Sequence, residues 1–183
     1  MTKSHTDPAT KLSIRRATVA DARAIADLVV RGWQAAYRDL MPADFLGGLS
    51  VPSREVAWRS MLEGDVDGLT PAWIAERNGR AVGFVSVGPP RDDEVPLPAA
   101  EVYALYVLPE AWRGGVGRSL LTTAVEYLRT RGAALLTLWV LEDNGPGRAF
   151  YEVMGWEPDG ARQPLEMAGF SVTEVRYRLP APE

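Results

Sequence analysis

The sequence predicts a single domain of the α/β or α+β class, built around one mixed β-sheet. The chain has 183 residues, of which 46% are hydrophobic and 24% charged, and this length and composition suit one globular domain. Apolar residues recur with a helical period in the first third of the chain. A hairpin signal follows, and then strands alternate with helices, which is the pattern expected of helices packed on a sheet.

The first third reads as one strand and three helices, preceded by a disordered lead over residues 1–11. A strand is expected over 12–17, and Thr18 with Asp21 three residues later resembles a capping box that opens a helix. That helix has a single apolar face, carrying Ile25, Leu28, Val29, Trp33 and Ala36. A short helix is expected after Pro42, and a third helix that Ser53 caps and Gly64 ends.

The remainder reads as five strands and two helices, all within one domain that spans 12–183. Asn78-Gly79 is a strong hairpin signal between strands 72–76 and 81–87. The elements expected after it are a strand over 99–108, a helix from the glycines at 114–117 to Gly132, a strand over 135–141, a helix over 146–154 and a last strand over 170–179.

Composition excludes several kinds of chemistry. The chain has no cysteine and one histidine, His5, which excludes disulfides, thiolate metal sites and cysteine nucleophiles and argues against a Ser-His-Asp triad; we expect no metal. The net charge of −4 with no basic block argues against nucleic acid as a partner. Without a long apolar segment or a secretory signal, the sequence predicts a cytoplasmic protein without a membrane partner.

The most informative segment is a glycine cluster between a strand and a helix. Residues 113–119 read Arg-Gly-Gly-Val-Gly-Arg-Ser, and glycines allow close backbone approach while the first turn of a helix has free N–H groups. This combination suits a phosphate or pyrophosphate. The segment matches neither the P-loop nor the dinucleotide fingerprint. A structural turn without a ligand is the alternative.

A second segment makes the pattern specific. Residues 144–156 begin with Asn144, a natural N-cap, and continue through Phe150-Tyr151-Glu152 to Gly155-Trp156. Together with Val107-x-Pro109, the loop at 112–117 and the opening at 14–18, this segment resembles the GCN5-related N-acetyltransferase (GNAT) superfamily over about residues 12–179. Trp112 departs from the usual Gln or Arg, and Gly147 from the commoner Ala; we expect both to matter little.

The resemblance implies a mostly antiparallel sheet with helices on both faces and a V-shaped splay between the strands at 101–108 and 135–141. It implies acetyl-CoA as co-substrate, with the pantetheine arm in the splay and the pyrophosphate on the glycine loop. The residues that it assigns to CoA are Tyr106, Val107, Leu108, Arg113, Gly114, Gly115, Val116, Gly117, Arg118, Ser119, Asn144, Phe150 and Tyr151.

The resemblance also implies direct transfer to an amine. Tyr151 would protonate the leaving thiolate, and Glu101 is the candidate base because related histone acetyltransferases carry a glutamate at this strand offset. The alternatives are a core tyrosine, a solvated carboxylate at 101, and Glu174 or the acids at 92–94 as the base. Because a free amine of pKa ~10.4 is about one part in a thousand neutral at pH 7, some base is needed.

The resemblance implies that the acceptor is an amine of a small molecule or of a peptide N-terminus. Candidate lining residues are Trp33, Tyr37 and Tyr103, with Phe45 and Trp58, although aromatics at helical spacing are more often core residues. A non-catalytic acyl-CoA sensor is the alternative from another class, and an O-acetyl or longer-acyl transferase is a third. A homodimer is common in the family, and the sequence leaves the oligomeric state open.

Overall fold

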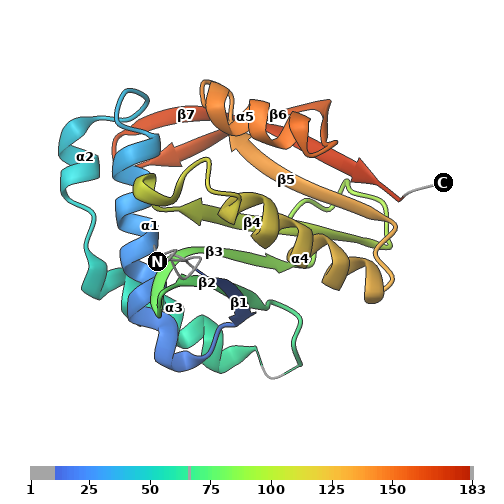
Figure 1. Cartoon of the computed structure of the whole chain (residues 1–183). Helices are drawn as coiled ribbons and strands as arrows, with labels where there is room; N and C mark the ends of the chain where they lie inside the picture. Colours follow the sequence, from blue (N-terminus) through green and yellow to red (C-terminus); the bar gives the residue numbers. More distant parts are fainter. Residues whose placement is uncertain (1–10, 66, 182–183) are drawn as a thin grey trace, which may run out of the picture.

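The computed structural model describes residues 11–65 and 67–181, which fold around one seven-stranded sheet (Figure 1). The strand order is β1-β2-β3-β4-β5-β7-β6, and every neighbouring pair is antiparallel except β4 and β5. The strands are β1 (Leu12–Arg16), β2 (Ala72–Arg77), β3 (Arg80–Gly88), β4 (Ala99–Val107), β5 (Leu135–Leu141), β6 (Glu157–Met167) and β7 (Phe170–Pro180).

Helices cover both faces of the sheet, as the sequence predicts. On one face α4 (Val116–Thr130) and α5 (Gly145–Val153) pack on the larger core, and Figure 1 shows α4 lying across this face. On the other face α1 (Ala22–Ala36) and α3 (Val51–Gly64) pack on a second core. The short helix α2 (Ala43–Gly47) follows α1, and two 3-10 turns, η1 (Val19–Asp21) and η2 (Pro109–Ala111), precede α1 and α4. Among the described residues, no helix has the length and apolar character to cross a membrane.

Most predicted elements are confirmed within one or two residues, and two details are wrong. Ser50, not Ser53, caps α3, because the Ser50 hydroxyl accepts the N–H of Ser53 at 3.3 Å. The prediction also omitted β6, where Pro158 and Pro164 disguise a strand; β6 is an edge strand, where proline is tolerated. Nearly all of the predicted lead, residues 1–11, lies outside the described residues.

A β-bulge in β4 changes which side chains face which helices. Ser86 pairs with Ala104 and Val87 with Val102, so Tyr103 is an extra residue. Before the bulge Val102 faces the α4 core, and after it Ala104 faces the α1 core. Tyr106 therefore lies on the α1 face of the sheet.

The predicted splay is confirmed between β4 and β5. The two strands pair only over 99–102 and 135–138, yet β4 continues to Val107 and β5 to Leu141. Beyond that point β4 stays paired with β3 and β5 with β7. The facing edges of two central strands are consequently left without partners, which is the site where another extended segment can pair.

Candidate functional site

The glycine loop adopts a backbone that most residues avoid. Arg113 has φ 57° and Gly115, the N-cap of α4, has φ 79°. The left-handed conformation at both positions turns the chain sharply between η2 and α4. Since the first three N–H groups of a helix have no partner within it, those of Val116, Gly117 and Arg118 are free for an anion.

Gly117 lies where α4 approaches the splay. A Cβ atom added there would lie 3.5 Å from the Phe150 ring and 3.7 Å from Val107, which is ordinary contact. Alanine therefore fits, whereas the two further methyl groups of valine would fill the space between α4, β4 and α5. The glycine leaves room at this junction that a bound chain can use.

Alternate residues of β4 direct their backbone N–H and C=O groups toward the free edge of the strand. The N–H of Leu108 already bonds the Val82 carbonyl at 2.9 Å, so the even positions, Tyr106 included, direct their backbone toward β3. The backbone of Leu105 and Val107 then faces the splay. Leu105 was not among the predicted cofactor residues; strand alternation alone, with the position of β3 known, would have found it.

The side chain of Trp112 contacts the free edge of β4. Its indole N–H donates to the Val107 carbonyl at 2.7 Å, while half of its surface is exposed. The expectation that Trp112 matters little does not account for this contact, because the indole N–H occupies a carbonyl at the free edge of β4. The N–H of Val107 is left as the group available on that residue.

On the opposite side of the splay, Asn144 caps α5 as predicted. Its side-chain oxygen accepts the Gly147 N–H at 3.1 Å. A Cβ at Gly147 would lie 2.5 Å from the Asn144 amide nitrogen, so glycine permits this position of the amide. Glycine at 147 thus leaves room for the amide of Asn144, which the Cβ of an alanine would crowd.

Tyr151 is held among aromatic rings on α5 and its neighbours. Its ring lies 5.3 Å from Phe150, 6.3 Å from Trp156 and 6.4 Å from Tyr177. Burial, followed by the effect of Tyr37, raises the pKa of the Tyr151 phenol well above its ordinary value. Tyr151 therefore carries its proton at neutral pH, and burial makes its phenol a weaker acid than an exposed tyrosine.

Two further tyrosines lie on the α1 side of the same gap. The hydroxyls of Tyr37, at the end of α1, and Tyr106, on β4, are 3.3 Å apart. Burial raises the pKa of both phenols, and Tyr151 contributes to the rise at Tyr106. Beside them the indole nitrogen of Trp33 is buried and has no hydrogen-bond partner among the described residues. The gap therefore holds polar groups contributed by both faces.

An apolar contact encloses this tyrosine pair. Phe45 of α2 lies 5.0 Å from Phe170 at the start of β7, and the segment after α1 packs against the tip of the β6–β7 hairpin. Phe45 thus lies near Trp33 and Tyr37, two other residues that the sequence predicts to line the acceptor site. Phe170 was missed because the β6–β7 hairpin was not predicted.

Two of the predicted lining aromatics lie elsewhere. Trp58 is buried against Phe84 in the core between α3 and the sheet. Tyr103 donates to the Pro89 carbonyl and lies under the Arg91 guanidinium, 4.9 Å from it, in the loop that joins β3 and β4. Neither contacts the tyrosine pair.

Glu101 is completely buried and engaged. Its carboxylate accepts the Arg91 backbone N–H at 2.8 Å and forms an ion pair with the Arg91 guanidinium. It lies on the α1 face like Tyr106, but five residues earlier on β4, roughly 15 Å along the strand. The sequence analysis did not name Arg91 as the partner of Glu101, because no local pattern joins residues that are ten positions apart on a loop and a strand.

The other candidate bases, Asp92 and Glu174, have different partners. Asp92 pairs with Arg176, which also bonds Asp159 at 2.7 Å, so this acid fastens the loop to β7. Glu174 accepts from the Gln163 amide at 3.2 Å and lies near enough to Tyr37 to raise its pKa. Glu174 is thus the candidate acid that adds to the rise in the pKa of Tyr37.

Comparison with known proteins agrees with this geometry. The pattern described as the Acetyltransferase (GNAT) family matches residues 33–156, which include the end of α1, the glycine loop and α5. The N-acetyltransferase YuaI of Bacillus subtilis is 32% identical over 92% of this chain and 93% of its own length.

Solved structures show the same fold. The PaiA N-acetyltransferase of Thermoplasma acidophilum in complex with coenzyme A has a TM-score of 0.75 and 16% identity, over 93% of this chain and 99% of that one. The ribosomal-protein-alanine N-acetyltransferase of Brucella melitensis has a TM-score of 0.72 and 26% identity, over 92% and 99%. The splayed sheet, the glycine loop and the match along the chain together make this protein a member of the GNAT family of N-acetyltransferases.

Proposed function

We propose that the protein transfers the acetyl group of acetyl-CoA directly to a primary amine of a small molecule or of a peptide N-terminus. The observation that carries this proposal is Tyr151, a protonated phenol on α5 whose pKa responds to Tyr37 across the gap and whose chain neighbour Phe150 approaches Gly117 of α4. An acyl donor that pairs with β4 would bring its thioester to this phenol. No other tyrosine on the α4 face combines these features among the described residues.

The donor would be held at three places. The free N–H groups of residues 116–118 would bind the pyrophosphate, with Arg113 and Arg118 adding charge. The backbone of Leu105 would pair with an amide of the pantetheine arm, as an added strand does. Asn144 and Phe150 would contact the arm from α5. The N–H of Val107 would also polarise the thioester carbonyl.

The reaction forms one C–N bond and breaks one C–S bond. The neutral amine attacks the carbonyl carbon, and the tetrahedral intermediate collapses with departure of the CoA thiolate. Tyr151 gives its proton to that sulfur, and the proton lost by the amine goes to a base. Without cysteine in the chain, no acetyl-cysteine intermediate forms.

The base is a carboxylate on the α1 face. Glu101 remains our first proposal, but its burial and its distance from Tyr106 require water between it and the amine, and Arg91 must release one oxygen. Glu174 is the alternative, since it lies close to Tyr37. Glu101→Gln and Glu174→Gln variants separate the two: the variant of the true base loses rate and the rise of rate with pH.

The amine would enter beside Trp33 and Tyr37. The buried indole N–H of Trp33 and the paired hydroxyls of Tyr37 and Tyr106 would meet polar groups of the acceptor. Phe45 and Phe170 close the site from outside. Substrate contact by Tyr103, which is turned toward the β3–β4 loop, would need that loop to shift.

The first experiment is calorimetric titration with acetyl-CoA and CoA, followed by an amine panel monitored by release of the CoA thiol. Tyr151→Phe should lower acetyl transfer about 10²–10³-fold with nearly unchanged CoA affinity, because only proton donation is lost. Tyr127→Phe is the matched control, since that hydroxyl bonds Gly68 at 2.9 Å, away from the splay.

The outcomes separate an enzyme from a sensor. Binding with transfer that depends on Tyr151 supports the proposal. Tight binding of acetyl-CoA without transfer to any amine in the panel favours a non-catalytic sensor. A Tyr151→Phe protein that transfers as fast as the wild type at every pH would remove the phenol from the mechanism.

A further inference from the structure

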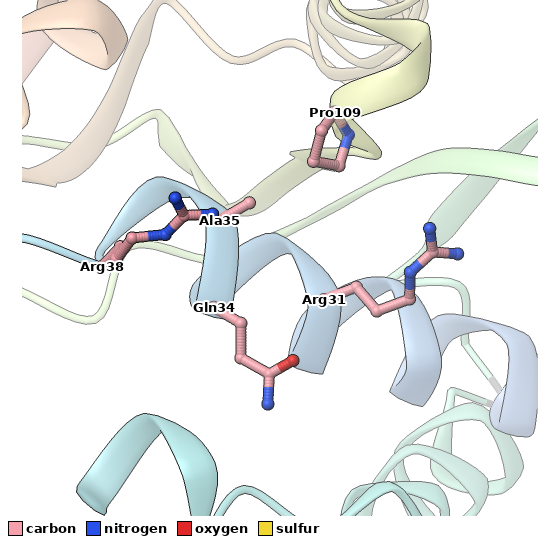
Figure 2. Close-up of a pocket in the computed structure, with 5 residues that line it drawn as sticks. All are labelled: Arg31, Gln34, Ala35, Arg38 and Pro109. Carbon is pink, nitrogen blue, oxygen red and sulfur yellow. The ribbon is translucent and has the colours of Figure 1, made fainter. Parts of the chain in front are cut away.

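The outward side of α1 and of the turn that follows it bears two arginines beside an open groove. Arg31 and Ala35 lie on α1, Arg38 lies in the turn after the helix ends at Ala36, and Pro109 of η2 lies opposite (Figure 2). The hollow between them has a volume of about 190 Å³ and adjoins a second of about 230 Å³.

The second hollow leads from α1 to the glycine loop. It is lined by Ala35, Arg38, Asp39, Pro109 and Trp112, and Trp112 directly precedes residues 113–118. We call the two hollows together, lined by Arg31, Gln34, Ala35, Arg38, Asp39, Pro109 and Trp112, the arginine groove. Its position beside the loop makes it a continuation of the proposed donor site.

Arg38 is a cation without a counter-charge. It forms no ion pair or hydrogen bond with any residue in 11–65 or 67–181, although Asp39 also lines the groove. Arg31, by contrast, pairs with Glu110 at 2.7 Å and with Asp27 at 3.6 Å. The groove therefore presents one free guanidinium and one that an anion must share with two carboxylates.

Trp112 supplies a fixed aromatic wall. The bond from its indole N–H to the Val107 carbonyl anchors one edge of the ring, and the other half of its surface is exposed. An anchored ring in solvent loses little freedom when a flat group stacks on it. Cation and ring together suit an anion that is joined to a larger organic group.

We propose that the arginine groove binds a phosphate or carboxylate of one of the two substrates, with Arg38 as its main partner. The proposal rests on the proposed function. Two sources are within reach: the 3′-phosphate of CoA, if its pyrophosphate lies on residues 113–118, and an anionic group of the acceptor, which would enter beside Tyr37. Both present the same chemistry to a guanidinium.

The test compares CoA with 3′-dephospho-CoA in wild type, Arg38→Ala and Arg23→Ala. If the donor is the source, Arg38→Ala weakens CoA about tenfold and leaves 3′-dephospho-CoA unchanged, while wild type prefers CoA by the same factor. Arg23 lies at the other end of α1 and pairs with Glu55, so its variant is the control and binds both ligands normally.

A second titration covers the acceptor as the source. Inorganic phosphate is added to the CoA-saturated protein and to the free protein, and the indole N–H resonance of Trp112 is followed by NMR. A shift at saturating CoA that disappears in Arg38→Ala assigns the groove to the acceptor. A shift seen only without CoA agrees with the donor.

The inference is overturned if Arg38→Ala binds CoA and 3′-dephospho-CoA as the wild type does and phosphate leaves the Trp112 resonance unmoved in both states. Failure of the proposed function looks different. In that case the wild type binds no CoA, while phosphate still shifts Trp112 in the free protein.

Discussion

At the scale of single residues, the gap between β4 and β5 is defined by three hydroxyls. Tyr37 and Tyr106 approach from the α1 face and Tyr151 from the α5 face, and burial raises the pKa of each phenol. Glu101 is paired with Arg91, whereas Glu174 adds to the rise in the pKa of Tyr37. The three phenols therefore hold their protons at neutral pH.

The ion pair between Asp21 and Arg15 lets the contribution of a paired carboxylate to stability be measured. The Arg15 guanidinium bonds the carboxylate at 2.7 and 2.8 Å, and Thr18 donates its N–H at 2.8 Å. Chiefly through Arg15, the pKa of Asp21 falls to about 2 despite burial, which opposes the shift. The folded pKa lies below the unfolded value near 3.8, so this stabilisation is complete above about pH 4 and is lost as pH falls through 2.

We expect Asp21→Asn to lower the free energy of unfolding by about 2 kcal/mol at pH 7. The measurement is urea denaturation of both proteins between pH 7 and pH 2.5, where the difference should shrink toward the acid end. A difference that stays constant over this range would show that the charge of Asp21 contributes nothing and that only packing is altered.

At the scale of elements, local signals identified most of the fold. Asn78-Gly79 predicted the β2–β3 hairpin, and both residues adopt positive φ, 54° and 72°. Such turns match the twist of the strands they join. The β6 strand was missed because its stability comes from pairing with β7, which no local pattern reports.

The hairpin turn offers a prediction for one element. Gly79→Ala should destabilise the protein by about 1–2 kcal/mol, since the added Cβ meets no atom within 4 Å and only the backbone conformation is strained. Gly64→Ala is the matched control: it also meets nothing within 4 Å, has no positive φ and ends α3. Chemical denaturation of both variants should give a loss for the first and little change or a gain for the second.

The same division between local and distant causes applies to the site. The glycine loop, Asn144 and Tyr151 could be placed from sequence because each belongs to a short motif on one element. Arg91 beside Glu101, and Trp112 against Val107, depend on how segments meet in space. Trp33 and Tyr37 lie beside Tyr106 at the gap, and their role as lining residues stays a prediction. Helical spacing could not separate them from Trp58, a core residue.

At the scale of the whole molecule, one sheet joins both cores and the proposed donor lies across its middle. The β4–β5 pair, with four residue pairs in register, is the junction between a four-stranded and a three-stranded half. A ligand that pairs with both free edges would extend this junction. It would therefore stabilise the molecule as a whole rather than one loop.

We expect acetyl-CoA at 100 times its dissociation constant to raise the free energy of unfolding by about 2.7 kcal/mol. For a domain of this size that corresponds to about 5–10 °C in the midpoint of thermal unfolding. Gly117→Val, which fills the space between Phe150 and Val107, should lose most of this ligand-induced shift while its unliganded midpoint remains measurable. A full shift in a folded Gly117→Val protein would show that the donor does not approach α4 at this residue.

The bulge at Tyr103 has an evolutionary consequence. Because side chains alternate along a strand, one extra residue decides that the Tyr106 phenol meets Tyr37 while Leu105 and Val107 meet α4. Loss of that single codon would exchange the two sets, placing a phenol in an apolar core and aliphatic side chains where the amine enters. Gain or loss of residues is tolerated in surface loops such as 89–98, but at position 103 it would invert the chemistry of the second half of the strand.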